Sequence, residues 1–397
     1  MKTLRLKRQE ERRLLGGHLW IYSNEVDTRE TPLTGFAPGE QVRVETQAGK
    51  MLGIAYVNPR SLICGRLVSG DERVLDASLL RERLAQALHL RNRLFDLPFY
   101  RLVFGESDLL PGLVVDRFGE HLAVQLNSAG MEAMKGEVMD VLRETLQPRS
   151  ILLRNDSSVR KLEELPQTVE EALGPVPREV ELIENGVKML APLHDGQKTG
   201  WFYDQRSNRA WLRQFARDSR VLDVFSYVGS FGVQAAAFGA REVLAVDASL
   251  AALTLAEKNA ALNGAGDRFN CLQGDAFAVL RGLKAEGERF DVVVVDPPAF
   301  IKRKKDHKEG LQAYHRINEL AMQLLVPDGI LISASCSMHL MREELQDVLR
   351  VAGRRLNRHV QLLAEGMQGP DHPVHPAIPE TRYLKAFLAR VTEGYKD

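Results

Sequence analysis

Short apolar runs alternate with longer stretches of mixed polarity through the second half of the chain. The runs span residues 221–225, 241–247, 270–273, 290–295 and 329–334, and each has the length of a buried strand. Strands that alternate with helical stretches predict parallel βαβ units, so we expect an α/β fold built on a parallel sheet. The helices and the last strand are expected at Val233–Ala237, Tyr314–Leu325, Met341–Leu356 and Tyr383–Val391.

The first part of the chain has a different pattern. After the basic segment Met1–Arg13, short apolar runs occur at 41–45, 51–57 and 62–68, and turn dipeptides such as Pro38-Gly39 separate them. Regularly spaced short strands predict a small β-barrel. We expect this β-barrel domain to span residues 1–73.

The middle of the chain mixes helices and strands. A long amphipathic helix is expected at 76–97, followed by strands up to 126, a helix at 131–146, a strand at 150–154 and a charged helix at 158–165. This pattern predicts a central α+β domain over residues 74–178. The third domain, 179–397, then begins with a hairpin at 179–190, because Asn185-Gly186 is a strong type I′ turn signal.

Composition narrows the partners and the compartment. Acidic and basic residues balance to a net charge of zero over 397 residues, so a nucleic-acid site has to be a local patch. The three cysteines lie far apart without a C-x-x-C pair, which argues against zinc and disulfides and fits a reducing cytosol. No apolar run reaches about 18 residues. We therefore expect a cytoplasmic protein without a metal or a membrane span.

Four acidic residues lie at the ends of strands of the predicted sheet. The run V-L-D-V-F-S-Y-V-G-S-F-G at 221–232 carries Asp223 and ends in a glycine-bearing turn before a helix, but it lacks the dinucleotide spacing G-x-G-x-x-G. Asp247, Asp275 and Asp296 end the next runs, and Asp247 stands where such sheets bind ribose hydroxyls. Each acid alone also suits a helix cap or a turn. Together they resemble the Rossmann-like class I S-adenosylmethionine-dependent methyltransferase fold.

This resemblance implies S-adenosylmethionine as the cofactor and a set of residues that bind it. From the sheet edge we expect Asp223, Phe225, Ser226, Tyr227, Gly229, Asp247, Asp275, Asp296 and Pro297. The polar and aromatic segment 194–209 is interpreted as a second hairpin leading into a helix, and its composition also suits a flap over the cofactor. Which of its residues touch the cofactor stays open; the candidates are Lys198, Thr199, Phe202, Asp204, Gln205 and Arg206.

Two residues at this edge are the catalytic candidates. Cys336 follows the apolar run 329–334, and Asp296 is fixed by the two prolines after it. Carbon 5 of cytosine is a poor nucleophile until a thiolate adds to carbon 6, so a cysteine here suits cytosine methylation. The motif Asp296-Pro297-Pro298 alone suits methylation of an exocyclic amine, such as guanine N2. Cys64 and Cys271 are expected to be inert core residues.

Candidate RNA contacts occur at both ends of the chain. Lys302, Arg303, Lys304 and Lys305 form a basic loop after the catalytic strand that would suit phosphates, although such runs are also ordinary solvated loops. G-G-H-L-W-I-Y-S-N-E-V at 16–26 resembles a PUA domain, an RNA-binding module. Glu106, Asp108 and Asp116 are metal-ligand candidates, but turn acids are the favoured interpretation.

The order of these motifs covers nearly the whole chain. It includes G-E-S-D-L-L-P-G-L-V-V-D-R-F-G at 105–119, D-P-P-A-F at 296–300, S-C-S at 335–337 and D-H-P-V at 371–374, which holds His372. It resembles the bacterial large-subunit ribosomal RNA methyltransferase I family, of the cytosine-5 type. The resemblance implies a 23S rRNA target and Cys336 as the nucleophile. A homodimer and a non-catalytic RNA-binding or assembly role stay open as alternatives.

Overall fold

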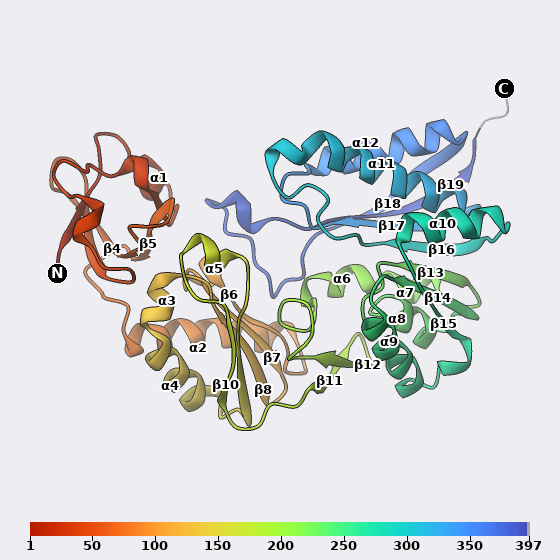
Figure 1. The fold of residues 1–397 in the computed structure, drawn as a ribbon, viewed down its shortest axis with the longest axis horizontal. Coiled ribbons are helices and arrows are strands. Elements are labelled where there is room, and N and C mark those ends of the chain that lie inside the picture. Colours follow the sequence, from red (N-terminus) through yellow and green to blue (C-terminus); the bar gives the residue numbers. More distant parts are fainter. Residues whose placement is uncertain (395–397) are drawn as a thin grey trace. The chain divides into compact units, whose positions relative to one another are not determined.

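The structure is a computed structural model that describes residues 1–394, and its chain forms two compact units (Figure 1). The first unit contains Met1–Val180, Ala191–Tyr203 and Pro370–Thr381. The second unit contains Glu181–Leu190, Asp204–Gly369 and the described residues from Arg382 onward. The first unit thus includes a late segment, 370–381, that returns to it from the end of the chain.

The first unit opens with a five-stranded sheet. Its strands, in spatial order, are β1 (Thr3–Arg5), β3 (Gln41–Glu45), β4 (Met51–Val57), β5 (Ile63–Ser69) and β2 (Trp20–Tyr22). The alternating pattern of β3 buries Val42 and Val44 against Ile21 of β2 and Val57 of β4. The strands expected at 41–45 and 51–57 are confirmed, and the third is shifted by one residue. Helix α1 (Arg12–Leu15) is a single turn before β2.

A second sheet completes the first unit. Its order is β10 (Thr168–Leu173), β9 (Ser150–Asn155), β8 (His121–Leu126), β7 (Leu113–Phe118) and β6 (Phe99–Phe104). Helices α2 (Ala77–Leu94) and α4 (Lys135–Leu146) lie together beside this sheet and share its apolar core (Figure 1). The short helices of this region are α3 (Ala129–Ala133) and α5 (Val159–Leu162).

Two expectations for this region were wrong in detail. The helix expected at 131–146 is split, because Met134 leaves helical geometry and separates α3 from α4. The helix expected at 158–165 is only the four-residue α5. Strand β10 has no apolar signal in the sequence because most of its side chains are exposed and two of them are glutamates.

The hairpin before the large sheet is confirmed. Strands β11 (Glu179–Glu184) and β12 (Val187–Pro192) pair with each other, and both turn residues have positive φ, 53° at Asn185 and 81° at Gly186. Two positive φ values are the signature of the type I′ turn. The second hairpin expected in 194–209 is wrong: this segment contains no strand, only a 3₁₀ turn at Tyr203–Gln205 and helix α6 (Arg206–Arg209).

The second unit is built on a seven-stranded sheet. Its order is β15 (Phe269–Gln273), β14 (Glu242–Asp247), β13 (Arg220–Val224), β16 (Phe290–Val295), β17 (Leu325–Ser335), β19 (Lys385–Glu393) and β18 (Arg358–Gly366). The first five strands are parallel, and β19 runs antiparallel between β17 and β18. The expected α/β class with a parallel sheet is therefore confirmed.

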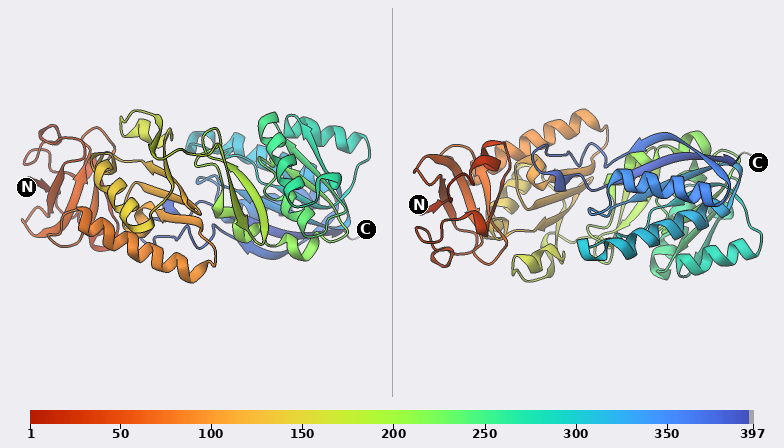
Figure 2. Two further views of the ribbon diagram at one scale, coloured as in Figure 1. Left: turned by 90° about the horizontal axis from the view of Figure 1, so that it is seen from below. Right: turned by 90° about the horizontal axis from the view of Figure 1, so that it is seen from above.

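Helices cover both faces of this sheet (Figures 1 and 2). Helices α10, α11 and α12 share a core with Leu222 and Val224 of β13, whereas α8 and α9 contact β14 and β15. The helices of this unit, besides α6, are α7 (Leu212–Phe215), α8 (Gly232–Ala237), α9 (Leu250–Leu262), α10 (Ala276–Ala285), α11 (His307–Gln323) and α12 (Arg342–Arg355). The helix expected at 314–325 starts earlier, at His307, and Leu325 already belongs to β17.

Candidate functional site

The candidate site residues lie near the point in the sheet where the order of the strands reverses direction. From β13 the chain moves outward through β14 to β15, and then it returns to the other side of β13 as β16. In parallel sheets this reversal separates the loops at the carboxyl ends of the two central strands, and ligands bind there. Asp223 lies in β13 and Asp296 directly follows β16, so the reversal brings two of the predicted acids to neighbouring strand ends.

The turn after β13 has an uncommon backbone. Phe225, Tyr227 and Gly229 have φ values of 64°, 51° and 79°, in the left-handed region that side chains other than glycine rarely occupy. In the left-handed region the non-glycine residues Phe225 and Tyr227 cost about 1–3 kcal/mol each, and strain of this kind tends to mark ligand sites. Neighbouring strand β14 holds the turn in place: Ser226 donates its N–H to Val246 O at 3.0 Å, and Tyr227 donates its N–H to Asp247 Oδ2 at 2.9 Å.

Glycine is required in this turn by packing. A Cβ at Gly229 would lie 2.9 Å from side-chain atoms of Val233 and Ala256, and the positive φ adds strain. A Cβ at Gly232 would lie 3.1 Å from Asp223 Oδ2. The bare backbone at Gly232 lets its N–H reach that same oxygen at 2.8 Å.

Asp223 is the most perturbed acid of the site. Its side chain is 1% exposed, Oδ2 accepts the Gly232 hydrogen bond, and Oδ1 has no hydrogen-bond partner. Burial raises the pKa of Asp223 to about 7; the negative charges of Asp296 and Asp247 add to the rise, whereas the Gly232 N–H and Arg209 oppose it. Three carboxylates are thus electrostatically coupled at one edge of the sheet, which favours a ligand with a positive charge.

The other two predicted acids have structural partners. Asp247 accepts backbone N–H groups at both oxygens, from Tyr227 and from Ser249, each at 2.9 Å. Asp275 caps helix α10 by accepting the N–H of Ala278 at 2.9 Å. Both acids therefore hold the loops that follow their strands.

Aromatic rings that the sequence analysis missed lie beside these loops. The ring of Phe300 is 6.2 Å from that of Phe225 and 6.1 Å from that of Phe277, between ring centres. Phe300 ends the motif D-P-P-A-F, and Phe277 lies in the first turn of α10. Aromatic residues two to four positions after strand-end acids were the available signal.

Cys336 follows β17 at the same edge of the sheet, because β17 is the parallel neighbour of β16. It is half-buried, and its Sγ lies 4.0 Å from the carbonyl oxygen of Pro297. The other cysteines lie elsewhere: burial raises the pKa of the Cys64 and Cys271 thiols to about 12. At neutral pH those two thiols stay protonated.

A hydrogen-bond network holds the loop around Cys336. The hydroxyl of Tyr314, on α11, forms hydrogen bonds of 2.8 Å with both Ser335 and Ser337. Ser337 Oγ also accepts the N–H of Ile301 at 3.1 Å. Beneath the loop, Lys385 of β19 donates from Nζ to the carbonyl oxygens of Ser337 and Leu340, the latter at 2.8 Å. No pattern in the sequence identifies Tyr314 or Lys385 as residues of the site.

The candidate residues of segment 194–209 are divided between the units. Lys198, Thr199 and Phe202 belong to the first unit. The Lys198 ammonium lies 4.8 Å from the centre of the Phe202 ring, and the buried Thr199 hydroxyl donates to the carboxylate of Asp116. The structure thus gives the Thr199 hydroxyl a partner inside the first unit.

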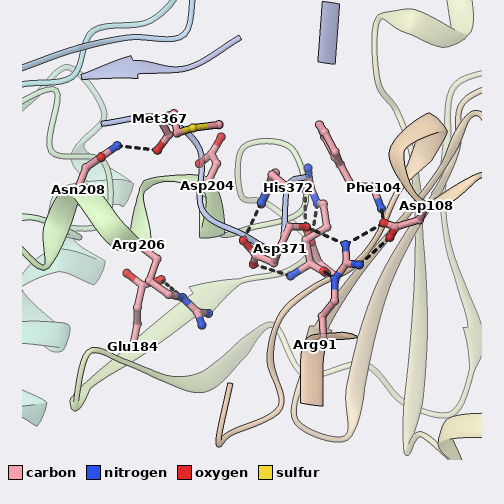
Figure 3. A network of polar contacts seen from close by, with 12 residues as sticks. Arg91, Phe104, Asp108, Glu184, Asp204, Arg206, Asn208, Met367, Asp371 and His372 are labelled. Atoms are coloured by element: carbon pink, nitrogen blue, oxygen red, sulfur yellow. Dashed lines mark hydrogen bonds and ion pairs between the residues drawn. The ribbon is translucent and has the colours of Figure 1, made fainter. Parts of the chain in front are cut away.

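Gln205 and Arg206 belong to the second unit with the strand-end acids. Gln205 Oε1 accepts a hydrogen bond of 2.6 Å from Asn208, and Arg206 Nε lies 3.6 Å from Glu184 Oε2 (Figure 3). Glu184 is fully buried and also pairs with Arg209 at 2.6 Å. This buried group attaches α6 to the hairpin strand β11.

The basic loop is on the surface. Lys302, Arg303, Lys304 and Lys305 are all exposed, and Arg303 pairs with Asp306 at 3.0 Å. Because an exposed ion pair contributes little, about 0–1 kcal/mol, the Arg303 guanidinium can exchange Asp306 for another anion at small cost. The loop follows D-P-P-A-F directly in the second unit.

The acids considered as metal ligands have other partners in the first unit. Asp108 forms a two-point ion pair with Arg91, at 2.6 and 2.8 Å, and Asp116 pairs with Arg101 at 2.7 Å. Glu106 accepts the indole N–H of Trp20 at 2.8 Å. Across residues 1–394, no three His, Cys, Asp or Glu side chains are grouped so as to hold a metal ion.

His372 also lies in this network of the first unit. Its Nδ1 is 2.9 Å from Asp371 Oδ1, and Asp371 Oδ2 accepts the N–H of Arg101 at 3.0 Å (Figure 3). Arg91 donates to the carbonyl oxygen of Asp371. The segment 370–381 is thereby fastened to β6 and α2. In the same described part of the chain, no helix is both long and apolar enough to cross a membrane.

Two family models match the chain. The model of the S-adenosylmethionine-dependent methyltransferases covers residues 144–365, and the model of the PUA-like domains covers residues 4–70. The first match includes the acids, the turn after β13 and Cys336. The second match includes the sheet β1-β3-β4-β5-β2.

Similar proteins cover nearly the whole length of the chain. Proteins named ribosomal RNA large subunit methyltransferase I are 38% identical in Erwinia tasmaniensis and 39% identical in Tolumonas auensis, over 97% and 98% of this chain and 98% and 99% of theirs. A solved methyltransferase in complex with SAH shares the fold with a TM-score of 0.84, at 20% identity, over 98% of this chain and all of that one.

Proposed function

The chain belongs to the ribosomal RNA large subunit methyltransferase I family, and from this premise we propose that it methylates carbon 5 of a cytosine in 23S ribosomal RNA through a covalent bond to Cys336. The expected cofactor, S-adenosylmethionine, and the PUA-like module are confirmed by the family matches. The position of the methyl group and the covalent step are the proposal.

The sheet edge fits this cofactor. Asp223 Oδ1 and Ser226 Oγ are buried oxygens without hydrogen-bond partners, and the three coupled carboxylates favour positive charge. S-adenosylmethionine, when bound, supplies a methyl group on a positively charged sulfur, together with an ammonium group and ribose hydroxyls. Asp223, Asp247 and the turn 225–229 are the residues that would hold it.

The position of Cys336 favours carbon 5 over an exocyclic amine. Methylation of an amine needs an acid such as Asp296 but no thiol, whereas carbon 5 must first gain electron density. In the proposed reaction the Cys336 thiolate forms a bond to carbon 6, and Asp296 in its protonated form donates a hydrogen bond to ring nitrogen 3, where negative charge develops. After carbon 5 takes the methyl group, a base removes its proton, the carbon–sulfur bond breaks and the thiolate is restored.

Two surfaces would hold the RNA. The PUA-like module and the exposed loop Lys302–Lys305 supply local positive charge, in a chain whose net charge is zero. The target cytosine must leave its stack to reach a sulfur at the sheet edge. A ribosomal RNA substrate would also place the reaction in the cytoplasm.

The variant Cys336→Ala tests the proposal, with Cys271→Ala as the matched control. We expect Cys336→Ala to bind S-adenosylmethionine in calorimetry but to transfer no methyl group to ribosomal RNA. Cys271→Ala should keep both properties because its thiol stays protonated on a different strand. Mass spectrometry of the wild-type product should place the methyl group on carbon 5 of a cytosine.

Two other results would each support a different function. Full activity of Cys336→Ala with the methyl group on an exocyclic nitrogen would support the amine reaction at Asp296-Pro297-Pro298. Absence of S-adenosylmethionine binding by the wild-type protein would support a non-catalytic RNA-binding role.

A further inference from the structure

A buried cation lies under the loop that carries Cys336. Lys385 is 9% exposed and occupies the first position of β19, where it pairs in register with Ser335 of β17. Its ammonium donates to the carbonyl oxygens of Ser337 and Leu340, on the far side of Cys336 in the chain. Lysine is rarely buried this deeply, so a specific reason is expected.

Hydrogen bonding alone does not explain a charged group here. Two carbonyl acceptors can be satisfied by a neutral donor at a smaller desolvation cost. Burial lowers the pKa of Lys385 to about 8, and this lowering reflects the desolvation cost of the buried ammonium. The negative charges of Cys336 and Glu344 act in the opposite direction and raise the pKa. A Cys336 thiolate stabilises the charged form of Lys385. Because the interaction free energy between two charges is mutual, the Lys385 ammonium stabilises the Cys336 thiolate by the same amount.

We propose that Lys385 is a positioning residue that orders the Cys336 loop and favours the thiolate form of Cys336. This inference deepens the proposed covalent mechanism and rests on it. Lys385 acts through Cys336, and Cys336 remains the group that bonds to the target cytosine. The ammonium carries its charge below about pH 8, so its help is greatest at and below neutral pH.

The loop itself carries half-buried His339, and the elements beside it supply further ionisable groups. Tyr314 of α11 hydrogen-bonds both serines beside Cys336, and burial raises its pKa, so it is a neutral hydroxyl at neutral pH. Glu344 of α12 pairs with His307 of α11 at 2.8 Å and helps to keep Lys385 charged. Asp296 follows the neighbouring strand β16. Among the groups named here, Lys385 is both positively charged and buried.

The test is the pH profile of Cys336 alkylation in the full-length protein without RNA. Iodoacetamide is the probe, and mass spectrometry of peptides follows each cysteine separately. Cys64 and Cys271, whose thiols have a pKa raised to about 12, are internal controls that should react slowly. An ordinary thiol reaches half its maximal rate near pH 8.5, and a nearby cation lowers this by about 1–3 units. We expect a midpoint of about 7.5 or below for wild-type Cys336.

Three variants separate charge from hydrogen bonding. Lys385→Gln keeps a donor for the carbonyls but removes the charge, Lys385→Arg keeps both, and Lys284→Met removes an exposed lysine of α10 in the same unit. We expect Lys385→Gln to raise the midpoint by about one pH unit, a tenfold slower alkylation at pH 7. Lys385→Arg and Lys284→Met should keep the wild-type midpoint, and calorimetry with S-adenosylmethionine should show that each variant is folded.

The proposal is overturned by a wild-type midpoint at or above pH 8.5, by no alkylation of Cys336 at any pH, or by a Lys385→Gln profile that overlies the wild type. A wild-type midpoint at or above pH 8.5 overturns the proposal even if Lys385→Gln does not fold. Because this assay needs no RNA and no methyl transfer, its failure is distinct from that of the proposed function, which the activity of Cys336→Ala decides.

Discussion

Asp223→Asn is the perturbation that tests most closely how the site binds its cofactor. The carboxylate is buried with one oxygen unpartnered, and burial together with Asp296 and Asp247 raises its pKa to about 7. Asparagine keeps an oxygen for the Gly232 N–H but carries no charge. The variant therefore removes the negative charge that we expect to attract the positively charged cofactor, and an NH2 group replaces the unpartnered oxygen.

The magnitude follows from the titration of Asp223. With a pKa of about 7, the carboxylate is ionised in about one-tenth of molecules at pH 6 and about nine-tenths at pH 8. If the cofactor needs the ionised form, its association constant in the wild type rises about tenfold over this range. The Asn variant should lack this rise, while the titration of the cofactor's own amino group affects both proteins alike.

Stability should change in the opposite sense. The folded pKa of Asp223 is above the ordinary 3.8, so the folded protein binds this proton more tightly than the unfolded chain. The stability of the cofactor-free protein therefore falls as pH rises from about 4 to about 7. Asp223→Asn should unfold at a higher temperature than the wild type at pH 8, and the difference should shrink toward pH 5.

Calorimetric titration at pH 6, 7 and 8 and thermal unfolding without cofactor measure both effects. Asp267→Asn is the matched control, because this exposed acid lies in the same unit and its loss should change neither quantity. Parallel affinity profiles for wild type and Asp223→Asn would refute the electrostatic account of the site.

Two further predictions concern the framework of the site. Glu184→Gln removes the negative charge that pairs with buried Arg209, so it should lower the free energy of unfolding by about 3–5 kcal/mol in denaturant titrations. Exposed Glu181→Gln should cost little, and equal effects would contradict the buried pair. Tyr314→Phe removes the hydroxyl that joins Ser335 and Ser337, so we expect about 1–3 kcal/mol of destabilisation and a lower kcat with unchanged cofactor affinity. An unchanged kcat in a folded Tyr314→Phe protein would show that the loop needs no such support.

Local patterns predicted the sheet and its acids well. The apolar runs around Asp223 and Asp296 are buried parallel strands, and period and length identify such strands without tertiary information. The hairpin turn at Asn185-Gly186 was equally accessible, because few other dipeptides accept two positive φ values.

The contacts that support the Cys336 loop could not be predicted from the sequence, for a physical reason. Lys385 reaches the loop only because β19 enters the sheet antiparallel beside β17, and this pairing joins residues that are far apart in the chain. The segment 194–209 misled for a related reason: its polar, aromatic and glycine-bearing composition suggested a hairpin, but the aromatic Trp201 and Tyr203 are buried by tertiary packing outside any strand. Tertiary contacts of this kind leave no periodic trace in the sequence.

The most direct test of the covalent mechanism is trapping with ribosomal RNA that contains 5-fluorocytidine. Fluorine replaces the proton that a base must remove from carbon 5, so the carbon–sulfur bond made by Cys336 cannot break after methyl transfer. We predict a protein–RNA adduct that survives denaturing electrophoresis, requires S-adenosylmethionine and maps to Cys336. Methylation of normal RNA without any adduct on the fluorinated RNA would contradict the account.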